Sequence, residues 1–452
     1  MATTAHYALT ALKSPELKRL GFLTGAHTGG TKSQLIDNLS QELRKSRLAA
    51  CVPVTDGKTD ARLLSIDMGI RNLAYCVLEV SDLHKFTNRA HSVATLSDYL
   101  HVPPQPDSML QHLRVTSWRR VVVNEHTVTS PNAQVDSTED AGASIGKVET
   151  TAFEPIAYAK LAYELVARLL RAYRPTTIII ERQRWRSGGA SSVLEWTIRV
   201  NMFEGMIHSA LETLRQQWHA RELGSHTIEG STSQDDKDEG GDVLATLAQF
   251  PDVYSASPKR VFDYWADHGT GESGNDDSIE GACKGEEKQV DMEGMSKELV
   301  KPCKLVPSKS KAQKQLKIGV VESWLRGVDR SVGVNLDKEA ASVLECIGDA
   351  ANIREAFLQK LSKQKGRGAR ADKSQQEQQP RQPMSAATVD KLDDLADCLL
   401  QGVTWVQWER NRQALSATLH RSSSAELGVP QSPSDEQRES APKSRRARMQ
   451  RG

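Results

Sequence analysis

The sequence contains few cysteines, and their spacing excludes two common ways of stabilising a small domain. The six cysteines are spread along 452 residues without a Cys-x-x-Cys pair: Cys51, Cys76, Cys283, Cys303, Cys346 and Cys398. A zinc site or a disulfide framework requires clustered or regularly paired cysteines. Neither is therefore expected, and the usage of cysteine indicates a reducing compartment.

Long apolar runs are also missing. No stretch approaches the ~18 apolar residues that a membrane-spanning helix requires, so no membrane association is expected. The N-terminus has no secretory hydrophobic region. Its first residues are rich in Ser, Thr and Ala and lack acids before Glu16, but Arg is sparse before Arg44, so the pattern of a mitochondrial transit peptide is incomplete.

Apolar residues are scarce in the chain as a whole. Only 38% of the residues are hydrophobic and the mean hydropathy is −0.51, which predicts one ordinary core diluted by polar insertions. The net charge of +1 says nothing by itself about nucleic acid, because acidic segments offset basic ones. The predicted organisation is a small helical module at 8–45, an α/β domain at 60–412 with low-complexity insertions at 222–250, 267–312 and 362–387, and a disordered basic tail at 413–452.

The first 45 residues have the pattern of two short helices. Ser14 and Pro15 indicate a helix start, and Gly21 is expected to end that helix. Thr31 can cap a second helix, whose apolar face includes Leu35 and Leu39.

The central segment alternates short apolar runs with longer helical patterns. Strands are predicted at 63–66, 73–80, 118–124 and 176–181, with helices at 156–173 and 191–218. Later elements are predicted at 253–265 (a strand running into a helix), 313–325, 338–361 and 389–412. This order predicts an α/β fold, a mixed sheet with crossover helices.

Carboxylates stand where these elements end or begin. Asp67 follows an apolar strand and precedes a glycine turn, and Glu181 follows three isoleucines. Asp393, Asp394 and Asp397 lie at the start of the last helix, where residues three or four apart share a face. Gathered carboxylates repel one another unless hard cations such as Mg²⁺ bind them, and two ions about 3.5–4 Å apart can clamp a phosphodiester.

Each acid also has an ordinary interpretation. Asp67 alone could be a turn or capping residue, and Glu181 could pair with Arg182 or Arg184. Asp393 and Asp394 could simply favour the positive end of the helix dipole. The order of strand acid, strand acid and helix acids favours the metal site over three separate coincidences.

Basic residues gather around the second acid. Seven Lys or Arg residues against two acids lie between 160 and 186, and Glu181 is followed directly by Arg182, Gln183, Arg184, Trp185 and Arg186. Such a loop beside a metal site is suited to binding phosphates and stacking bases. The alternative is a solvated loop in which Trp185 anchors the core or a dimer.

Three further segments have two interpretations each. Lys259 and Arg260 could hold the scissile phosphate or lie at the surface start of a helix. Lys32, after Gly29 and Gly30, could place a helix N-terminus against phosphate, or belong to a helical hairpin that contacts protein. On the second long helix, Val200, Phe203 and Ile207 could face a partner subunit or the core.

Several motifs together resemble the fungal mitochondrial Holliday-junction resolvases, which are relatives of bacterial RuvC in the RNase H superfamily. The matching segments are SIDMGIRNLAYCVLE, IIIERQRWRSG, SASPKRVFDYW and KLDDLADCLLQGVTW, and SPELKRLGFLTG…TKSQLIDNL resembles a SAP-like module. The sequence departs from the family pattern in its insertions, its basic tail and Leu392, where another Lys is expected.

The resemblance implies an RNase H-like mixed five-stranded sheet and a homodimer in the mitochondrial matrix. It implies paired nicks in four-way junction DNA, with Mg²⁺ or Mn²⁺ as cofactor, two ions per site. Asp67, Glu181 and Asp394 become metal ligands, with Asp397 or Asp393 as the fourth. Arg71 and Asn72 of the first motif join the expected DNA contacts.

Three other functions fit parts of the sequence. A sugar kinase or actin-like ATPase shares the opening Asp-x-Gly hairpin, but it needs a second phosphate loop and a Gly-Gly motif after a late strand. Gly188 and Gly189 follow the Glu181 loop instead. A non-catalytic junction-binding protein and a superfamily nuclease that acts on RNA/DNA hybrids are the further alternatives.

Overall fold

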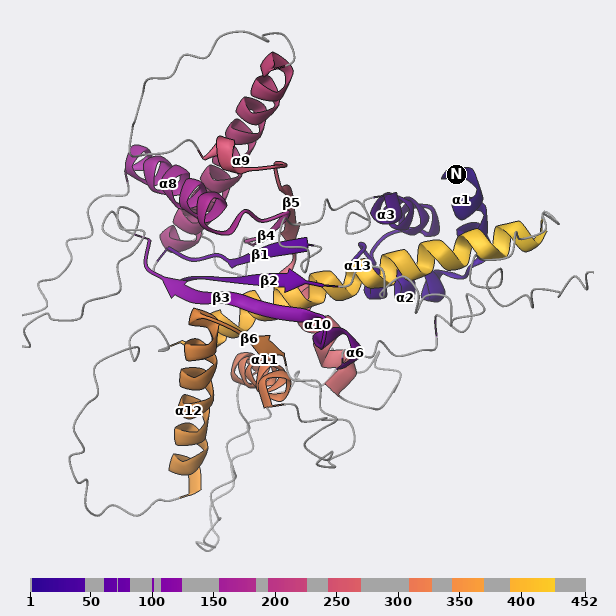
Figure 1. The fold of residues 1–452 in the computed structure, drawn as a ribbon. Coiled ribbons are helices and arrows are strands. Elements are labelled where there is room, and N and C mark those ends of the chain that lie inside the picture. Colours follow the sequence, from indigo (N-terminus) through magenta and orange to yellow (C-terminus); the bar gives the residue numbers. More distant parts are fainter. Residues whose placement is uncertain are drawn as a thin grey trace, which may run out of the picture.

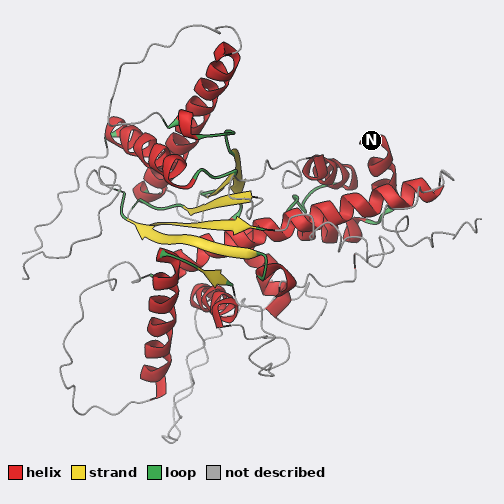
Figure 2. Cartoon of the chain, in the orientation of Figure 1, coloured by secondary structure: helices red, strands yellow, loops and turns green. Residues whose placement is uncertain are grey.

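A mixed β-sheet lies at the centre of the molecule, and helices cover both of its faces (Figure 1; Figure 2). The computed structural model describes residues 2–44, 61–70, 72–81, 100, 107–123, 154–183, 194–225, 243–269, 309–326, 344–369 and 391–426. Among the expected site residues, Arg71, Arg184, Trp185 and Arg186 lie outside these ranges.

The sheet has six strands in the order β5-β4-β1-β2-β3-β6. They are β1 (Ala61–Asp67), β2 (Leu73–Val80), β3 (Leu113–Val121), β4 (Thr177–Glu181), β5 (Asp252–Ala256) and β6 (Glu345–Cys346). β2 runs antiparallel to both β1 and β3, whereas β4 is parallel to β1 and to β5. This confirms the predicted mixed sheet, although the resemblance implied five strands. The sixth strand, β6, was not predicted, and it pairs with β3 through only two residues.

Two helical layers sandwich the sheet. One face is covered by α8 (Pro155–Tyr173) and α9 (Glu195–Ser225). The other is covered by α10 (Pro258–Gly269), α11 (Lys309–Arg326), α12 (Asp349–Ala369) and α13 (Leu392–Glu426). Both faces of β4 are buried: Ile178 and Ile180 pack toward α8 and α9, and Ile179 packs toward the opposite layer. This explains the unbroken run of isoleucines before Glu181.

The helix α13 crosses the sheet and then continues beyond it for many residues (Figure 1). Gly402 lies where α13 meets β1 and β2, and a Cβ atom there would come 2.7 Å from Leu78 Cδ1. Any larger residue would therefore force the buried Leu78 side chain to shift, which favours glycine at this close approach. A disordered tail was expected from residue 413, which is wrong for its first part: α13 extends to Glu426, because Leu415 and Leu419 are buried under N-terminal helices.

The N-terminal segment forms three helices, not two: α1 (Ala2–Ala11), α2 (Ser14–Thr24) and α3 (Lys32–Arg44). Gly21 does not end α2, which continues to Gly25, a left-handed residue with φ of 73°. Thr31 does cap α3, since its Oγ1 accepts a hydrogen bond from the Gln34 backbone N–H at 3.4 Å. The apolar faces of these helices pack on the end of α13, and their SAP-like role stays a prediction.

Several predicted boundaries differ from the structure. β3 begins at Leu113, five residues before the expected start. The helix expected at 338–361 is instead β6 followed by α12, and residues 338–343 lie outside the described ranges. The expected insertions are shorter at their edges because α9, α10, α11 and α12 extend into them, and a short helix η3 (Leu244–Thr246) lies inside the first. A further short helix, α6 (Asp107–Leu110), precedes β3.

The longest helices carry many polar residues. None of the helices in the described ranges is long and apolar enough to cross a membrane.

Candidate active site

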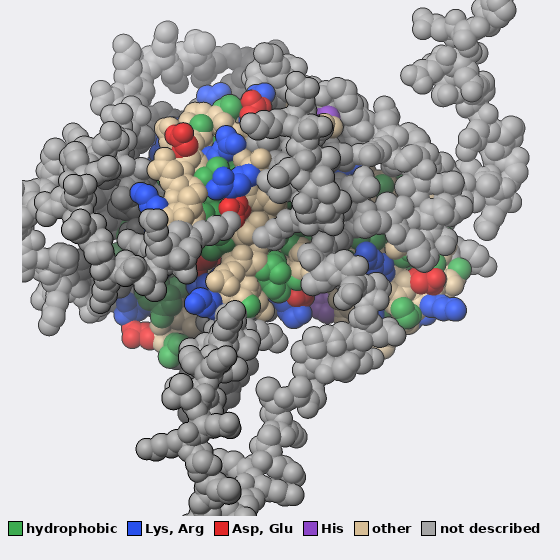
Figure 3. Space-filling view, turned by 90° about the horizontal axis from the view of Figure 1, so that it is seen from below, with side chains coloured by type: hydrophobic (Ala, Val, Ile, Leu, Met, Phe, Trp, Pro, Cys, Tyr) green, Lys and Arg blue, Asp and Glu red, His purple; other side chains and the backbone are tan. Residues whose placement is uncertain are grey.

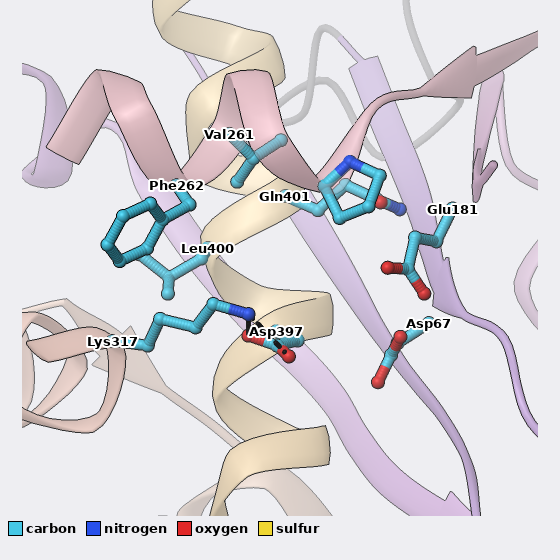
Figure 4. Close-up of a pocket in the computed structure, with 9 residues that line it drawn as sticks. Asp67, Glu181, Val261, Phe262, Lys317, Asp397, Leu400 and Gln401 are labelled. Carbon is cyan, nitrogen blue, oxygen red and sulfur yellow. Dashed lines mark hydrogen bonds and ion pairs between the residues drawn. The ribbon is translucent and has the colours of Figure 1, made fainter. Parts of the chain in front are cut away.

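Asp67 and Glu181 meet at the ends of adjacent parallel strands. β1 and β4 pair in register up to Ile66 and Ile180, so the next residue of each strand carries a carboxylate. The two carboxylates face one another in Figure 4. Burial raises the pKa of Asp67 well above its usual value, and the negative charge of Glu181 raises it further. Without a cation nearby, the Asp67 carboxyl therefore binds a proton more readily than an exposed aspartate does.

Each of the three helix acids meets its own basic side chain. Asp397 accepts from the Lys317 ammonium at 2.8 Å through Oδ1 and at 2.9 Å through Oδ2. Asp393 pairs with Lys314 at 2.6 Å, and Asp394 Oδ2 lies 3.8 Å from Arg120 Nε. These cations come from α11 and β3, and sequence reasoning assigned none of them to the site.

The basic partners offset the effect of burial on the pKa of these three acids to different extents. Burial raises the pKa of Asp394 to about 6, helped by the neighbouring Asp393. Burial also raises the pKa of Asp397 to about 6, although Lys317 opposes the shift. Burial alone would raise the pKa of Asp393 too, but its ion pair with Lys314 lowers it below the ordinary value.

A small hollow brings part of this acidic set together (Figure 4). Its polar side is formed by Asp67, Glu181, Asp397 and Lys317. Its apolar side is formed by Pro258, Val261 and Phe262 of α10 with Leu400 of α13. Asp393 and Asp394 do not line it, although the charge of Asp394 still acts on Asp67. Of the helix acids, Asp397 is therefore the one that faces the strand pair.

Gln401 ties α13 to the two strands that carry Asp67 and Glu181. Its side-chain amide donates to Ser65 Oγ at 3.1 Å, to the carbonyl of Ile66 at 3.1 Å and to that of Ile179 at 3.3 Å. Ser65 Oγ in turn donates to the Cys398 carbonyl at 2.8 Å. The amide lies one turn of helix after Asp397, so these bonds set the position of the helix acid relative to the strand acids.

A sixth acid, Glu204 of α9, lies close to the same region. Its carboxylate accepts a hydrogen bond from the Gln183 backbone N–H at 3.0 Å. Burial raises the pKa of Glu204, the hydrogen bond from Gln183 opposes the shift, and the charge of Glu181 adds to it. The Gln183 side chain donates to Glu181 Oε2 at 3.0 Å. Sequence reasoning missed Glu204 because a single acid on a helix carries no signal.

The residues predicted to contact DNA are dispersed. Asn72 Oδ1 accepts from Arg120 Nη2 at 3.1 Å, and the Arg182 backbone N–H donates to Ala256 at 2.8 Å. Lys259 pairs with Asp263 at 2.7 Å, Arg260 donates to the Gly25 carbonyl, and Lys32 donates to the Thr10 carbonyl at 2.8 Å. Neither Lys259 nor Arg260 lines the hollow. Their contact with a phosphate stays a prediction.

The surface near α11 and α12 carries charges of both signs. In Figure 3, Lys and Arg side chains are interspersed with Asp and Glu over the described part of this face. The charge of the described part of this face is therefore mixed.

The donor set suits a hard divalent cation. The hollow offers carboxylate oxygens, the ligands that Mg²⁺ and Mn²⁺ prefer, and no His or Cys side chain lines it. The raised pKa of Asp67 is the electrostatic cost that a bound cation would remove. Within the described ranges, however, no three Asp, Glu, His or Cys side chains already converge closely enough to hold one ion. Asp397 is instead held by Lys317.

Comparisons with known proteins agree with the sequence motifs. Residues 63–415 match the family model described as mitochondrial resolvase Ydc2 / RNA splicing MRS1. The mitochondrial cruciform cutting endonuclease 1 of Schizosaccharomyces pombe is 26% identical over 231 residues, which are 51% of this chain and 63% of that relative. The match thus spans less than two thirds of the relative's length.

Two solved structures were also found. The yeast mitochondrial Holliday junction resolvase Ydc2 has a TM-score of 0.40 at 18% identity, covering 90% of this chain and 98% of that one. Thermus thermophilus RuvC has a TM-score of 0.23 at 12% identity, covering 67% and 96%. The family model itself spans well over half of the chain and includes all five acids of the site. The resemblance predicted from the motifs is thereby confirmed, and the chain belongs to the mitochondrial resolvase Ydc2 / RNA splicing MRS1 family.

Proposed function

We propose that this protein is a divalent-metal-dependent endonuclease that resolves four-way (Holliday) DNA junctions during mitochondrial DNA recombination. The observation that carries the proposal is the meeting of Asp67 and Glu181 at the ends of adjacent strands, with Asp397 in the same hollow. A non-catalytic junction-binding protein has no need to bury carboxylates together at an electrostatic cost. The mitochondrial location follows that of the similar family and of the S. pombe relative.

The proposed metal ligands are Asp67 and Glu181 for one ion, with Asp397 and Asp394 serving a second. A bound Mg²⁺ or Mn²⁺ ion would stabilise negative charge on the scissile phosphate and make a water molecule nucleophilic. The protein's own part is positional. Gln401 fixes the helix acids relative to the strand acids, and the apolar wall that includes Val261 and Phe262 keeps bulk water from one side of the reacting phosphate.

The proposed substrate is symmetric, so a twofold dimer is the expected assembly. Leu194, which directly precedes α9, and Ile198 and Met202 of α9 are spaced by four residues, and each is more than a third exposed, at 69%, 39% and 37%. Phe203 and Ile207, which were candidates for a dimer contact, are fully buried in the core instead. We therefore place the contact between subunits on the stripe of Leu194, Ile198 and Met202.

The dimer contact can be tested apart from catalysis. Replacing Ile198 by Asp is expected to convert the protein to a monomer in analytical ultracentrifugation. Leu223→Asp provides a matched control, because Leu223 is 75% exposed at the other end of α9. A monomeric control or a dimeric Ile198→Asp variant would locate the contact elsewhere.

The activity is tested with purified protein, Mg²⁺ and a labelled synthetic four-way junction. Linear duplex, RNA/DNA hybrid and a structured RNA serve as competing substrates. Paired nicks in the junction alone, lost in Asp67→Asn, are the expected result. Cleavage of the hybrid instead would retain the nuclease and change its substrate. RNA binding without any nicking would favour the splicing role named in the family's description.

A further inference from the structure

Lys317 places a positive charge inside a hollow whose other charged side chains are carboxylates. Its ammonium contacts both carboxylate oxygens of Asp397, at 2.8 and 2.9 Å, and it is the one basic side chain among the described residues that line the hollow. The side chain is only 21% exposed, whereas Lys314, one turn earlier on α11, is 58% exposed. Lys317 is therefore held inside the site, and Lys314 lies at its edge.

The contact with Lys317 divides the acids into two sets. Asp67 and Glu181 face each other, and no basic side chain from the described residues of the hollow comes between them. Asp397 directs both of its oxygens to Lys317, as the dashed lines in Figure 4 show. Both oxygens that a metal ion would use on Asp397 are thus already bound to a cation.

We propose that Lys317 is a resident cation that controls how many divalent ions the site holds. A first ion binds to Asp67 and Glu181 without displacing any cation, and a second ion reaches Asp397 only when the Lys317 ammonium leaves. This inference rests on the proposed metal-dependent function, and it assigns to Lys317 the order and the relative affinity of the two ions.

The same geometry suggests what releases Lys317. A lysine ammonium is a compact charge on a flexible four-carbon stem, so it can turn from Asp397 to a phosphate oxygen placed in the hollow. DNA that offers such an oxygen would free Asp397 for the second ion. Because coupling between two ligands is reciprocal, the second ion and the phosphate must then strengthen each other's binding through Lys317. Lys317 is thus a positioning residue that links substrate binding to completion of the metal site.

The test counts bound ions rather than activity. Mn²⁺ binding to the full chain without DNA is followed by the loss of the free-ion electron paramagnetic resonance signal. For the wild type we expect one Mn²⁺ ion bound tightly and a second one weakly. Lys317→Met, which keeps the length of the side chain and removes its charge, is expected to bind the second ion about tenfold more tightly. Lys314→Met is the matched control and is expected to change the affinity of the second site much less, because its ammonium pairs with Asp393, which does not line the hollow.

A second comparison uses cleavage-resistant junction DNA with phosphorothioate linkages at the exchange point. The DNA is expected to tighten the second Mn²⁺ site of the wild type but to have much less effect in Lys317→Met. Lys317→Arg keeps a cation in place and is expected to retain the weak second site. If Lys317→Met folds poorly by circular dichroism, Asp397→Asn replaces it: this variant is expected to lose the second site and keep the first.

The outcomes separate the inference from the function on which it rests. If Lys317→Met and the wild type bind the second ion equally, while Asp67→Asn abolishes tight binding, the inference about Lys317 fails and the metal site stands. If Asp67→Asn binds both ions as the wild type does, the carboxylates are not the ligands and both proposals fail.

Discussion

Replacing Gln401 by Met would test whether one buried amide holds the active site together. Gln401 is 3% exposed, and its amide donates to Ser65 Oγ and to two strand carbonyls. Methionine has a similar length and fits an apolar surrounding, but it donates no hydrogen bond. A net hydrogen bond contributes about 0.5–1.5 kcal/mol, and a buried acceptor left without its donor costs about 1–3 kcal/mol. We therefore expect a loss of about 2–4 kcal/mol in the free energy of unfolding.

The assay has two measurements, because a purely structural role and a positioning role predict different results. Urea unfolding followed by circular dichroism gives the free energy of unfolding. Mn²⁺ binding to the folded protein without urea gives the affinity of the site for each ion. Gln401→Met is expected to weaken binding of the second ion more than that of the first, since Gln401 sets the distance between α13 and the strands.

Ser65→Ala is the matched control for this prediction. It removes one bond from Gln401 and the bond to the Cys398 carbonyl, but it leaves the two bonds from Gln401 to the strands. We expect about half of the destabilisation and little change in Mn²⁺ binding. Stability of Gln401→Met within about 0.5 kcal/mol of the wild type, with unchanged ion binding, would refute the reasoning.

Three further predictions concern charge and packing. Asp67→Asn is expected to raise the free energy of unfolding of the metal-free protein at pH 7, because a carboxyl whose pKa is raised by burial and by Glu181 destabilises the fold when ionised. This gain in the free energy of unfolding should shrink as the pH falls toward 3.8, the ordinary pKa of an aspartate. Adding Mn²⁺ should stabilise the wild type but not the variant. Urea titrations at several pH values, with and without Mn²⁺, measure both effects. Gly402→Ala is expected to cost about 1–3 kcal/mol in thermal unfolding, since its Cβ would lie 2.7 Å from Leu78 Cδ1, and an unchanged melting temperature would contradict the packing. Leu415→Ala is expected to cost about 2–5 kcal/mol and to increase hydrogen exchange in α2 and α3, whereas exchange confined to α13 would show that the N-terminal helices fold independently.

The strand acids could be predicted from the sequence because they depend on local patterns. Three isoleucines predict a strand buried on both faces, and an acid directly after them is conspicuous. Asp67 stands out for the same reason. Each acid can be picked out from the pattern of its own strand. Because β1 and β4 are adjacent and parallel in the sheet, the two carboxylates then lie side by side. Their role as metal ligands stays a prediction.

Lys317 and Gln401 could not be predicted in the same way. Lys317 lies 80 residues from Asp397 in the sequence. No sequence pattern in the segment between them predicts that the two side chains meet. Gln401 is a polar residue on a helix that would ordinarily face solvent, and only the docking of α13 on β1 and β4 buries it. Gly21 is wrongly read as a helix end for a related reason. A Cβ there would lie 3.1 Å from Thr28 Cγ2, a tight contact that favours glycine although its helix propensity is lower by about 1 kcal/mol.

The 35-residue α13 joins the acids at one end to the N-terminal helices at the other. Between these ends, Arg412 is 2% exposed and is bound by Glu409 at 2.7 Å and by the Thr24 carbonyl at 2.9 Å, while Asn411 donates to the Leu23 carbonyl at 2.7 Å. An ion pair so deeply buried is costly unless all its partners are in place. The attachment of α2 to α13 is therefore specific in register, not a loose apolar contact. Through these bonds, the N-terminal helices are fixed to the same helix that carries Asp397 into the hollow.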